Sequence, residues 1–177
     1  MTGEVTGSPG NGPVHVVVMG VSGSGKTTVA QGIARATGMV FAEADQFHSA
    51  ANVAKMRAGI ALDDSDRQPW LESLAAWMQA EDRRGHSTVV ACSALRRAYR
   101  DILRTGPPGL DFVHLAGPVE LLHERMAARE GHYMPPSLLG SQLNTLEPLQ
   151  PDESGVVLDL RDPPQELVSQ AVSWLRR

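Results

Sequence analysis

The sequence predicts an α/β domain in which a parallel five-stranded sheet carries helices on both faces. Three observations predict it: short valine-rich runs recur along the chain, helical segments separate them, and a glycine-rich turn joins the first run to the first helix. Such uniformly apolar runs are typical of parallel strands, which are buried on both sides. The 177 residues suit one compact domain. We expect it to span residues 14–177, after a flexible tail at 1–13 that is rich in Gly, Pro, Ser and Thr.

The expected strands are the five apolar runs at 14–19, 39–42, 87–92, 112–115 and 156–160. The expected helices lie at 26–37, 52–57, 68–84, 95–104, 119–129, 137–146 and 164–175. Gly38, Gly59 and Gly85 follow three of these helices, and glycine commonly ends a helix. Pro69 is expected in the first turn of the third helix, where its missing N–H costs nothing. The apolar stripe of that helix, which includes Trp70, predicts a face buried against the sheet.

Composition and charge disfavour several classes of protein. A net charge of -4 and a pI near 5.8 argue against a nucleic-acid partner, which a basic surface would normally meet. No apolar run approaches the ~20 residues of a membrane span, and no signal pattern opens the chain. Cys92 is the single cysteine, which suits a reducing compartment. We therefore expect a cytoplasmic protein whose partner is neither nucleic acid nor a membrane.

The sharpest local signal is the segment GVSGSGKT at 20–27, a full match to G-x-x-x-x-G-K-[ST]. Its glycines allow backbone N–H groups to point at phosphate oxygens, and the following helix adds a positive N-terminal dipole. Lys26 would reach the β- and γ-phosphates of a nucleotide, and the Thr27 hydroxyl would ligate Mg²⁺. The sequence therefore predicts a three-layer P-loop NTPase fold. The expected nucleotide-binding residues of the loop are Gly20, Ser22, Gly23, Ser24, Gly25, Lys26, Thr27 and Thr28.

Other motifs distinguish between kinds of P-loop protein. The chain has no N-K-x-D segment, which reads guanine in GTPases, and its third strand does not end in the acid that many ATPases use for their metal. Carboxylates instead follow the second strand, at Glu43 and Asp45. Ligands of open α/β sheets bind at the carboxyl ends of the strands. We therefore expect Asp45 to orient the acceptor hydroxyl and take its proton.

Beyond the phosphate loop, the chain resembles the gluconate kinase family from about Val14 to Arg177. The shared segments include A-D-Q-F-H at 44–48, L-D-D-S-D-R at 62–67, P-W-L at 69–71, C-S-A-L at 92–95, Y-R-D at 99–101, G-H-Y at 131–133 and S-Q at 141–142. The resemblance implies an adenylate- or shikimate-kinase-like fold with a lid at about 125–147. It also implies ATP and Mg²⁺ as cofactors, transfer of a phosphoryl group to the 6-hydroxyl of D-gluconate, and a homodimer.

Two departures from the family pattern lie close to the second strand. The family usually has Asp, then Gly, then Asp, where this chain has Glu43-Ala44-Asp45. Glu43 keeps the charge for the metal but reaches about one carbon further. Ser49 replaces the proline that usually follows His48. Neither change removes a group that the reaction needs.

The expected substrate-binding residues are Asp45, His48, Lys55, Arg67, Ser93, Arg96 and His132. A carboxylate is bound best by a planar cationic fork, which makes Arg67 the leading candidate. Its alternative role is a salt bridge to a neighbouring aspartate. Arg125 and Arg129 lie four residues apart and share a helix face. In related kinases such lid arginines close over ATP, so the expected catalytic residues are Asp45, Lys26, Arg125 and Arg129; the alternative for the two arginines is a solvated basic face.

Two other functions remain open from the sequence. One is a kinase for another small hydroxy acid, with shikimate-type kinases as neighbours, although these would carry a glycine-rich turn in place of C-S-A-L at 92–95. The other is a nucleotide-binding sensor without catalysis. Intact Lys26, Asp45 and Arg67 argue against the sensor, and ATP turnover stimulated by a sugar acid would exclude it.

Overall fold

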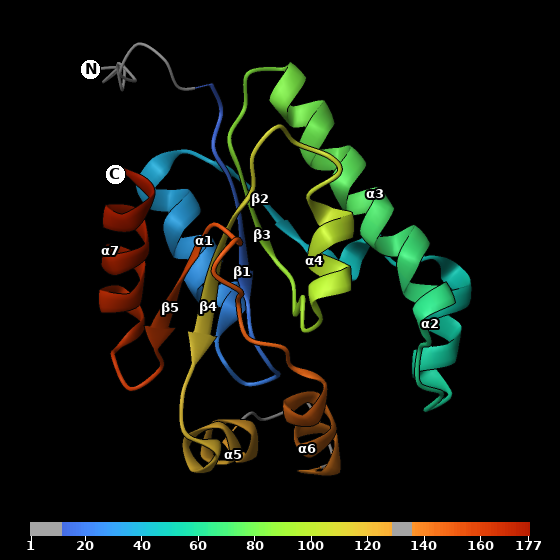
Figure 1. Ribbon diagram of the computed structural model, residues 1–177. Helices are drawn as coiled ribbons and strands as arrows, with labels where there is room; N and C mark the ends of the chain where they lie inside the picture. Colours follow the sequence, from blue (N-terminus) through green and yellow to red (C-terminus); the bar gives the residue numbers. More distant parts are fainter. Residues whose placement is uncertain (1–11, 129–135) are drawn as a thin grey trace.

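A single parallel sheet forms the centre of the molecule. The computed structural model describes residues 12–128 and 136–177, and its five strands pair in the order β2-β3-β1-β4-β5. The strands are β1 (His15–Met19), β2 (Val40–Glu43), β3 (Thr88–Ala91), β4 (Asp111–Ala116) and β5 (Gly155–Asp159). Every pairing is parallel, so the carboxyl ends of the strands share one edge, at the bottom of Figure 1. The predicted fold class is confirmed.

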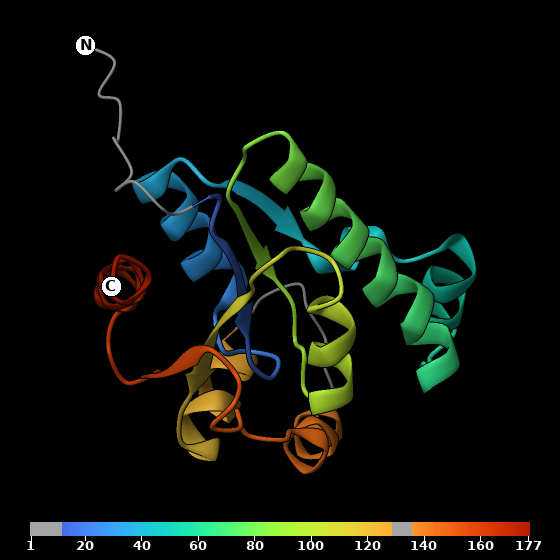
Figure 2. The same cartoon turned by 45° about the horizontal axis from the view of Figure 1, so that its top comes forward.

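Helices cover both faces of this sheet and its lower edge. The helices are α1 (Lys26–Thr37), the 3₁₀ helix η1 (Ala44–Phe47), α2 (Ala50–Arg57), α3 (Asp64–Arg83), α4 (Arg97–Leu103), α5 (Val119–Ala127), α6 (Pro136–Thr145) and α7 (Pro164–Leu175). α1 and α7 lie on one face and α3 and α4 on the other, while α5 and α6 lie below the carboxyl edge (Figures 1 and 2). Within the described residues, no helix is both long and apolar enough to cross a membrane.

Two hydrophobic cores, one on each face, hold these layers together. Strand β1 divides its side chains between them: Val16 and Val18 pack on the α1 and α7 side, whereas Val17 and Met19 pack on the α3 and α4 side. All four are fully buried, which explains why the strand is apolar throughout rather than alternating. Trp70 is buried in the second core, as its position on the stripe of α3 predicts.

The start of α3 differs from the prediction. The helix begins at Asp64 rather than at Gln68, so Pro69 lies inside it and not in its first turn. A capping box explains the earlier start: the Asp63 carboxylate accepts a hydrogen bond from the Asp66 amide at 2.8 Å, and the Asp66 carboxylate accepts one from the Asp63 amide at 3.1 Å. These two bonds satisfy amides of the first turn, which offsets the hydrogen bond that Pro69 cannot make.

Gly106 allows the loop after α4 to lie directly on α3. A Cβ at this position would be 2.1 Å from the Ala75 carbonyl oxygen, a backbone atom that cannot move without the helix. We expect Gly106→Ala to lower the free energy of unfolding by about 3 kcal/mol, as severe overpacking does. Gly109→Ala is the matched control, because nothing lies within 4 Å of its added Cβ. Urea denaturation checks this; equal stability of the two variants would contradict it.

His114 of β4 makes the fold sensitive to acid. Burial lowers the pKa of His114 to about 4, with the Arg100 charge acting in the same direction, against 6.5 when unfolded. The unfolded chain therefore binds the extra proton first, so stability is present above pH 6.5 and is lost as the pH falls toward 4. Between pH 7 and 5 we expect the free energy of unfolding to fall by roughly 2 kcal/mol because of His114. The His114→Leu variant should not show this part of the fall. Urea denaturation at both pH values checks it; an equal loss in the variant would contradict it.

Candidate active site

The glycine-rich loop between β1 and α1 has the shape that its motif predicts. Gly25 caps α1 with a φ of 83°, a left-handed conformation that glycine adopts without strain. A Cβ on Gly20 would lie 2.8 Å from the Ser24 hydroxyl and 2.9 Å from the Leu115 carbonyl oxygen. The loop therefore curls tightly over the end of β1, with the amino end of α1 behind it.

Lys26 and Ser22 of this loop have specific hydrogen-bond partners. The Lys26 ammonium donates to the Val21 carbonyl at 3.1 Å, and the Ser22 amide donates to the Gln142 side-chain oxygen of α6 at 2.6 Å. The Ser24 hydroxyl is buried and has no hydrogen-bond partner within residues 12–128 and 136–177. Thr28 is exposed at the start of α1. Gln142 thus brings α6 against the predicted phosphate loop.

Thr27 and Glu43, the two residues predicted to hold the metal, are in direct contact. The Thr27 hydroxyl donates to the Glu43 carboxylate at 2.6 Å, which joins the first turn of α1 to the end of β2. Among the residues described, no group of three His, Cys, Asp or Glu side chains lies close enough to hold a metal ion. Magnesium usually takes one or two protein oxygens and completes its shell with phosphate and water. One hydroxyl and one carboxylate therefore fit Mg²⁺ bound together with a nucleotide.

Asp45 lies beside this pair, on the 3₁₀ helix η1 that follows β2. The Trp70 indole N–H donates to the Ala44 carbonyl at 2.7 Å and so fixes η1 to α3, while Asp45 stays exposed. Burial raises the pKa of the Cys92 thiol to about 12; the charges of Asp45 and Glu43 act in the same direction, and Lys26 opposes them. All three charged groups therefore act on the residue that follows β3, and Cys92 stays a protonated thiol.

His48 connects Asp45 to the cationic residues of α3. Its ring stacks on Trp70 with a centroid distance of 4.2 Å, and its Nδ1 lies 3.4 Å from the Asn52 amide nitrogen. Burial lowers the pKa of His48; the Asp45 charge raises it and the Arg67 charge lowers it again. Burial thus favours the neutral imidazole, and the contacts with Trp70 and Asn52 fix its orientation.

Arg67 and Arg96 come together from different elements. The two guanidinium groups share the Asp64 carboxylate, at 3.9 Å from Arg67 and 3.7 Å from Arg96, and both lie over the Tyr99 ring. The Tyr99 hydroxyl donates to Asp64 at 2.7 Å and accepts a hydrogen bond from Arg67 at 3.2 Å. Two positive charges against one carboxylate leave a net positive cluster. The salt bridge considered as an alternative for Arg67 therefore exists, but it does not neutralise the site.

The remaining predicted residues are placed differently. Lys55 is not part of this cluster, because its ammonium binds the Asp66 carboxylate at 2.9 Å and 3.0 Å. Ser93 lies in the loop after β3, and its carbonyl accepts a hydrogen bond from the Gly20 amide at 3.4 Å. Arg125, in the last turn of α5, donates to the Leu160 carbonyl at 2.8 Å. Arg129 and His132 lie outside the described residues.

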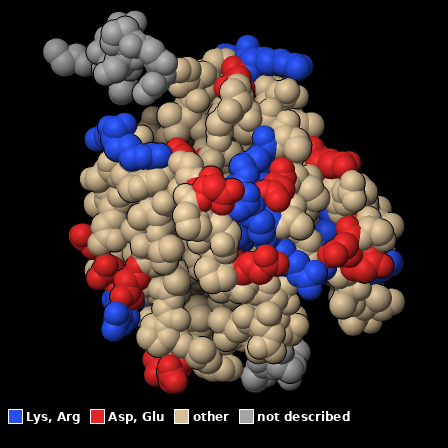
Figure 3. Space-filling model, viewed as in Figure 1, with Lys and Arg blue, Asp and Glu red and all other residues tan. Residues whose placement is uncertain are grey.

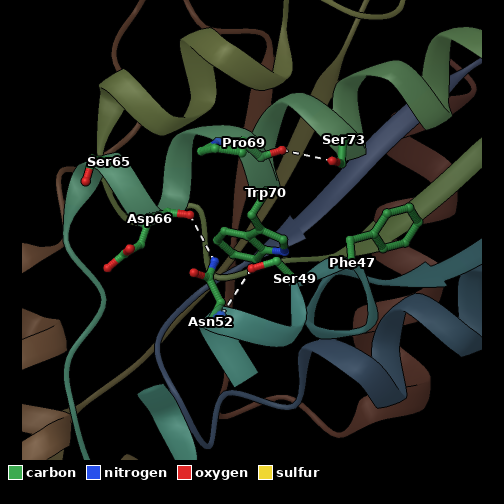
Figure 4. Close-up of a pocket in the computed structure, with 8 residues that line it drawn as sticks. All are labelled: Phe47, Ser49, Asn52, Ser65, Asp66, Pro69, Trp70 and Ser73. Atoms are coloured by element: carbon green, nitrogen blue, oxygen red, sulfur yellow. Dashed lines mark hydrogen bonds between the residues drawn. The ribbon is translucent and has the colours of Figure 1, made fainter. Parts of the chain in front are cut away.

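A cavity of about 350 Å³ opens between α2 and α3 (Figure 4). Its lining residues are Phe47, Ser49, Asn52, Ser65, Asp66, Pro69, Trp70 and Ser73. Trp70 connects the cavity to the predicted acceptor residues, because it lines the cavity and its ring also stacks on His48. The lining includes none of the phosphate loop, so this cavity adjoins the predicted acceptor residues without being the site of transfer.

Sequence reasoning missed three residues of this site. Asp64 and Tyr99 organise the two arginines, and Gln142 contacts the phosphate loop. Asp64 lies in the L-D-D-S-D-R segment and Tyr99 in the Y-R-D segment, so the shared motifs marked both without indicating their function. Gln142 also lies in a shared segment, S-Q at 141–142, but that segment did not indicate a contact with the phosphate loop 120 positions away.

Comparison with known proteins finds relatives that match most of this chain. A family model described as an AAA domain matches residues 16–149. A gluconokinase of Gluconobacter oxydans is 49% identical over 141 residues, covering 80% of this chain and 79% of that protein. The structure of a gluconokinase from Sinorhizobium meliloti has a TM-score of 0.83 at 46% identity, covering 92% of this chain and 91% of the other. That of a sugar kinase from a Janibacter species has a TM-score of 0.87 at 62% identity, with 92% and 94% covered. The chain belongs to the gluconokinase family of P-loop kinases.

Proposed function

We propose that this protein transfers the γ-phosphoryl group of ATP to the 6-hydroxyl of D-gluconate, giving 6-phospho-D-gluconate and ADP. The observation that carries the proposal is the cluster of Arg67 and Arg96 around one carboxylate, near Asp45 and at the same sheet edge as the phosphate loop. A kinase for a sugar acid needs both halves, a phosphate cradle and a cationic site for the acceptor. The gluconokinases among its relatives support the choice of acid.

On the acceptor side, the carboxylate of gluconate binds the guanidinium groups of Arg67 and Arg96. A planar fork binds a carboxylate through two parallel hydrogen bonds, which also fixes the direction of the substrate chain. The neutral ring of His48 is placed to hydrogen-bond a hydroxyl along that chain. Asp45 then orients the terminal hydroxyl and accepts its proton as the new P–O bond forms.

On the nucleotide side, the loop amides and Lys26 bind the β- and γ-phosphates of ATP. Lys26 exchanges its contact with the Val21 carbonyl for phosphate oxygens. Thr27 and Glu43 would hold Mg²⁺, which when bound neutralises the phosphate charge. Because phosphoryl transfer is mainly positioning and charge neutralisation, these few groups are enough. A lid at 125–147 with Arg125 and Arg129, a role for Lys55 or His132, a homodimer and a cytoplasmic location remain predictions.

The test is a coupled assay of ADP release from Mg-ATP, alone and with D-gluconate, shikimate and several other aldonic acids. We expect strong stimulation by gluconate and a phosphorylated product that carries its phosphate on carbon 6. Turnover on a different acid would support a kinase activity but would contradict gluconate as its substrate. Tight ATP binding without turnover on any acid would indicate a sensor.

Arg67 is the residue on which discrimination for a carboxylate should depend most. We expect Arg67→Lys to raise KM for gluconate about 10- to 100-fold, because lysine keeps the charge but lacks the fork and cannot bind Tyr99 and substrate together. KM for ATP should stay within about twofold. Arg83→Lys, at the exposed far end of the same helix, is the control. Steady-state kinetics check this, and a rise in KM for ATP alone would contradict it.

A further inference from the structure

Arg100 of α4 is a fully buried arginine that lies outside the acceptor cluster. Acidic and basic atoms alternate in the middle of the face shown in Figure 3, where Figure 1 shows α4. The outer members of this network are exposed pairs such as Arg97 with Asp101 and Arg97 with Asp152. At its centre, Arg100 and the side chain of Glu153 are both 0% exposed. A buried ion pair is weak evidence for stability, so its specific contacts are the feature to explain.

Every N–H group of the Arg100 side chain has an acceptor. Nε and Nη2 form a fork on the Glu153 carboxylate at 2.7 Å and 3.1 Å. Nη1 donates to the Ala94 carbonyl at 2.9 Å and the Leu95 carbonyl at 3.3 Å, and Nη2 also donates to the Pro148 carbonyl at 3.2 Å. These five bonds use all five donors of a guanidinium group. A lysine has three donors and no fork, so it cannot replace them.

Two of the carbonyls that Arg100 binds, those of Ala94 and Leu95, belong to the loop between β3 and α4. Ala94 has a φ of 46°, a left-handed conformation that costs a non-glycine residue free energy and persists only where neighbours impose it. The Glu147 amide donates to the Leu95 carbonyl at 2.7 Å, so this oxygen has two donors. The backbone of the loop is therefore held from outside by side chains and chain segments far along the sequence.

This loop carries groups of the acceptor site at both ends. Ser93 precedes Ala94, and its carbonyl accepts the Gly20 amide of the phosphate loop. Arg96 follows Leu95 and reaches the Asp64 carboxylate. A change in the Ala94 conformation would move both ends relative to one another. The direction of Arg96, and its distance from the phosphate loop, thus depend on the carbonyls that Arg100 binds.

We propose that Arg100, held by Glu153, is a positioning residue that fixes the loop 93–96 and so sets the geometry of the acceptor cluster. Arg100 touches no substrate in this role; it acts through Ser93 and Arg96. The kinetic part of the proposal rests on the proposed gluconate kinase activity. The structural part, that Arg100 holds the loop, does not.

The test compares Arg100→Lys with Arg104→Lys in the full chain. Arg104 is the matched control, because it also lies at α4 and binds Glu153 at 2.9 Å, but it does not bind the carbonyls of Ala94 and Leu95. We expect Arg100→Lys to lower kcat/KM for gluconate at least tenfold, mainly through KM, with KM for ATP within threefold. Arg104→Lys should leave both within twofold. Equal effects of the two variants, or a change in melting temperature alone, would overturn the proposal.

Amide hydrogen exchange separates this proposal from the proposed function. The amides of 93–96 should exchange at least tenfold faster in Arg100→Lys than in Arg104→Lys, whichever acid the wild type phosphorylates. If the wild type does not use gluconate, the proposed function fails. The amide exchange rates of 93–96 then test the positioning role of Arg100 by themselves. Should Arg100→Lys not fold, Glu153→Gln takes its place, with an expected threefold rise in both exchange rate and KM for gluconate. Unchanged values in Glu153→Gln would then overturn the proposal.

Discussion

Asp45→Asn is expected to lower kcat with gluconate by about 10²–10⁴-fold, the usual contribution of a general base. Asparagine has nearly the same shape and still accepts a hydrogen bond, so it orients the acceptor hydroxyl but cannot take its proton. Phosphoryl transfer has a loose transition state in which little proton transfer is needed early, which favours the lower part of this range. Because Asp45 is exposed on η1 and η1 is fixed by the bond from Trp70 to Ala44, the variant should fold normally.

The kinetic pattern of this variant distinguishes a base from a binding residue. KM for ATP and the rise in melting temperature caused by ATP should remain those of the wild type, since the phosphate loop is untouched. Gln46→Ala is the control, because Gln46 is the exposed neighbour of Asp45 on the same 3₁₀ helix. Steady-state kinetics and thermal unfolding check both variants. A kcat within threefold of the wild type would remove Asp45 from the reaction and leave the acceptor proton to water.

The parts of the fold that follow from local patterns could be predicted from the sequence. The strand at β1 and the helix α1 follow from an apolar run, a glycine-rich turn and Gly38, all within one stretch of chain. The same holds for α7, which begins at Pro164 as predicted. The start of α3 could not be placed as well, because Pro69 is a strong local signal and the capping box of Asp63 and Asp66 outweighs it.

The site also has a part that local sequence patterns predict and a part that depends on how distant elements pack. The phosphate loop and the pairing of Thr27 with Glu43 were predictable, because one motif and the end of the adjacent strand supply them. The acceptor cluster was predicted only as separate cations. That Arg67 and Arg96 share Asp64, whereas Lys55 binds Asp66, depends on how α2, α3 and α4 pack. A single sequence does not carry that information, because the partners lie on different elements.

Lys26→Met is expected to lower kcat/KM for ATP by about 10³-fold or more. Removing one preorganised donor from a developing negative charge costs about 10²–10³-fold, and Lys26 supplies a full positive charge as well. Methionine keeps most of the side-chain length and no charge, so the loop should keep its backbone shape around Gly20 and Gly25. Catalysis should fall more than ATP affinity, because negative charge shifts onto the oxygens of the leaving β-phosphate toward the transition state, and Lys26 is expected to bind that phosphate.

Measurements on this variant have to distinguish a loss of catalysis from a loss of the structure of the phosphate loop. Gln31→Ala is the control, since Gln31 is exposed on the same helix. Titration calorimetry should show weaker ATP binding in Lys26→Met, while the melting temperature without nucleotide stays within about 2 °C. A large fall in that temperature would mean that Lys26 holds the loop together through its contact with Val21, and the loss of turnover would then be structural. Wild-type turnover in Lys26→Met would contradict transfer at this loop, because no phosphate cradle works at full rate without its cation.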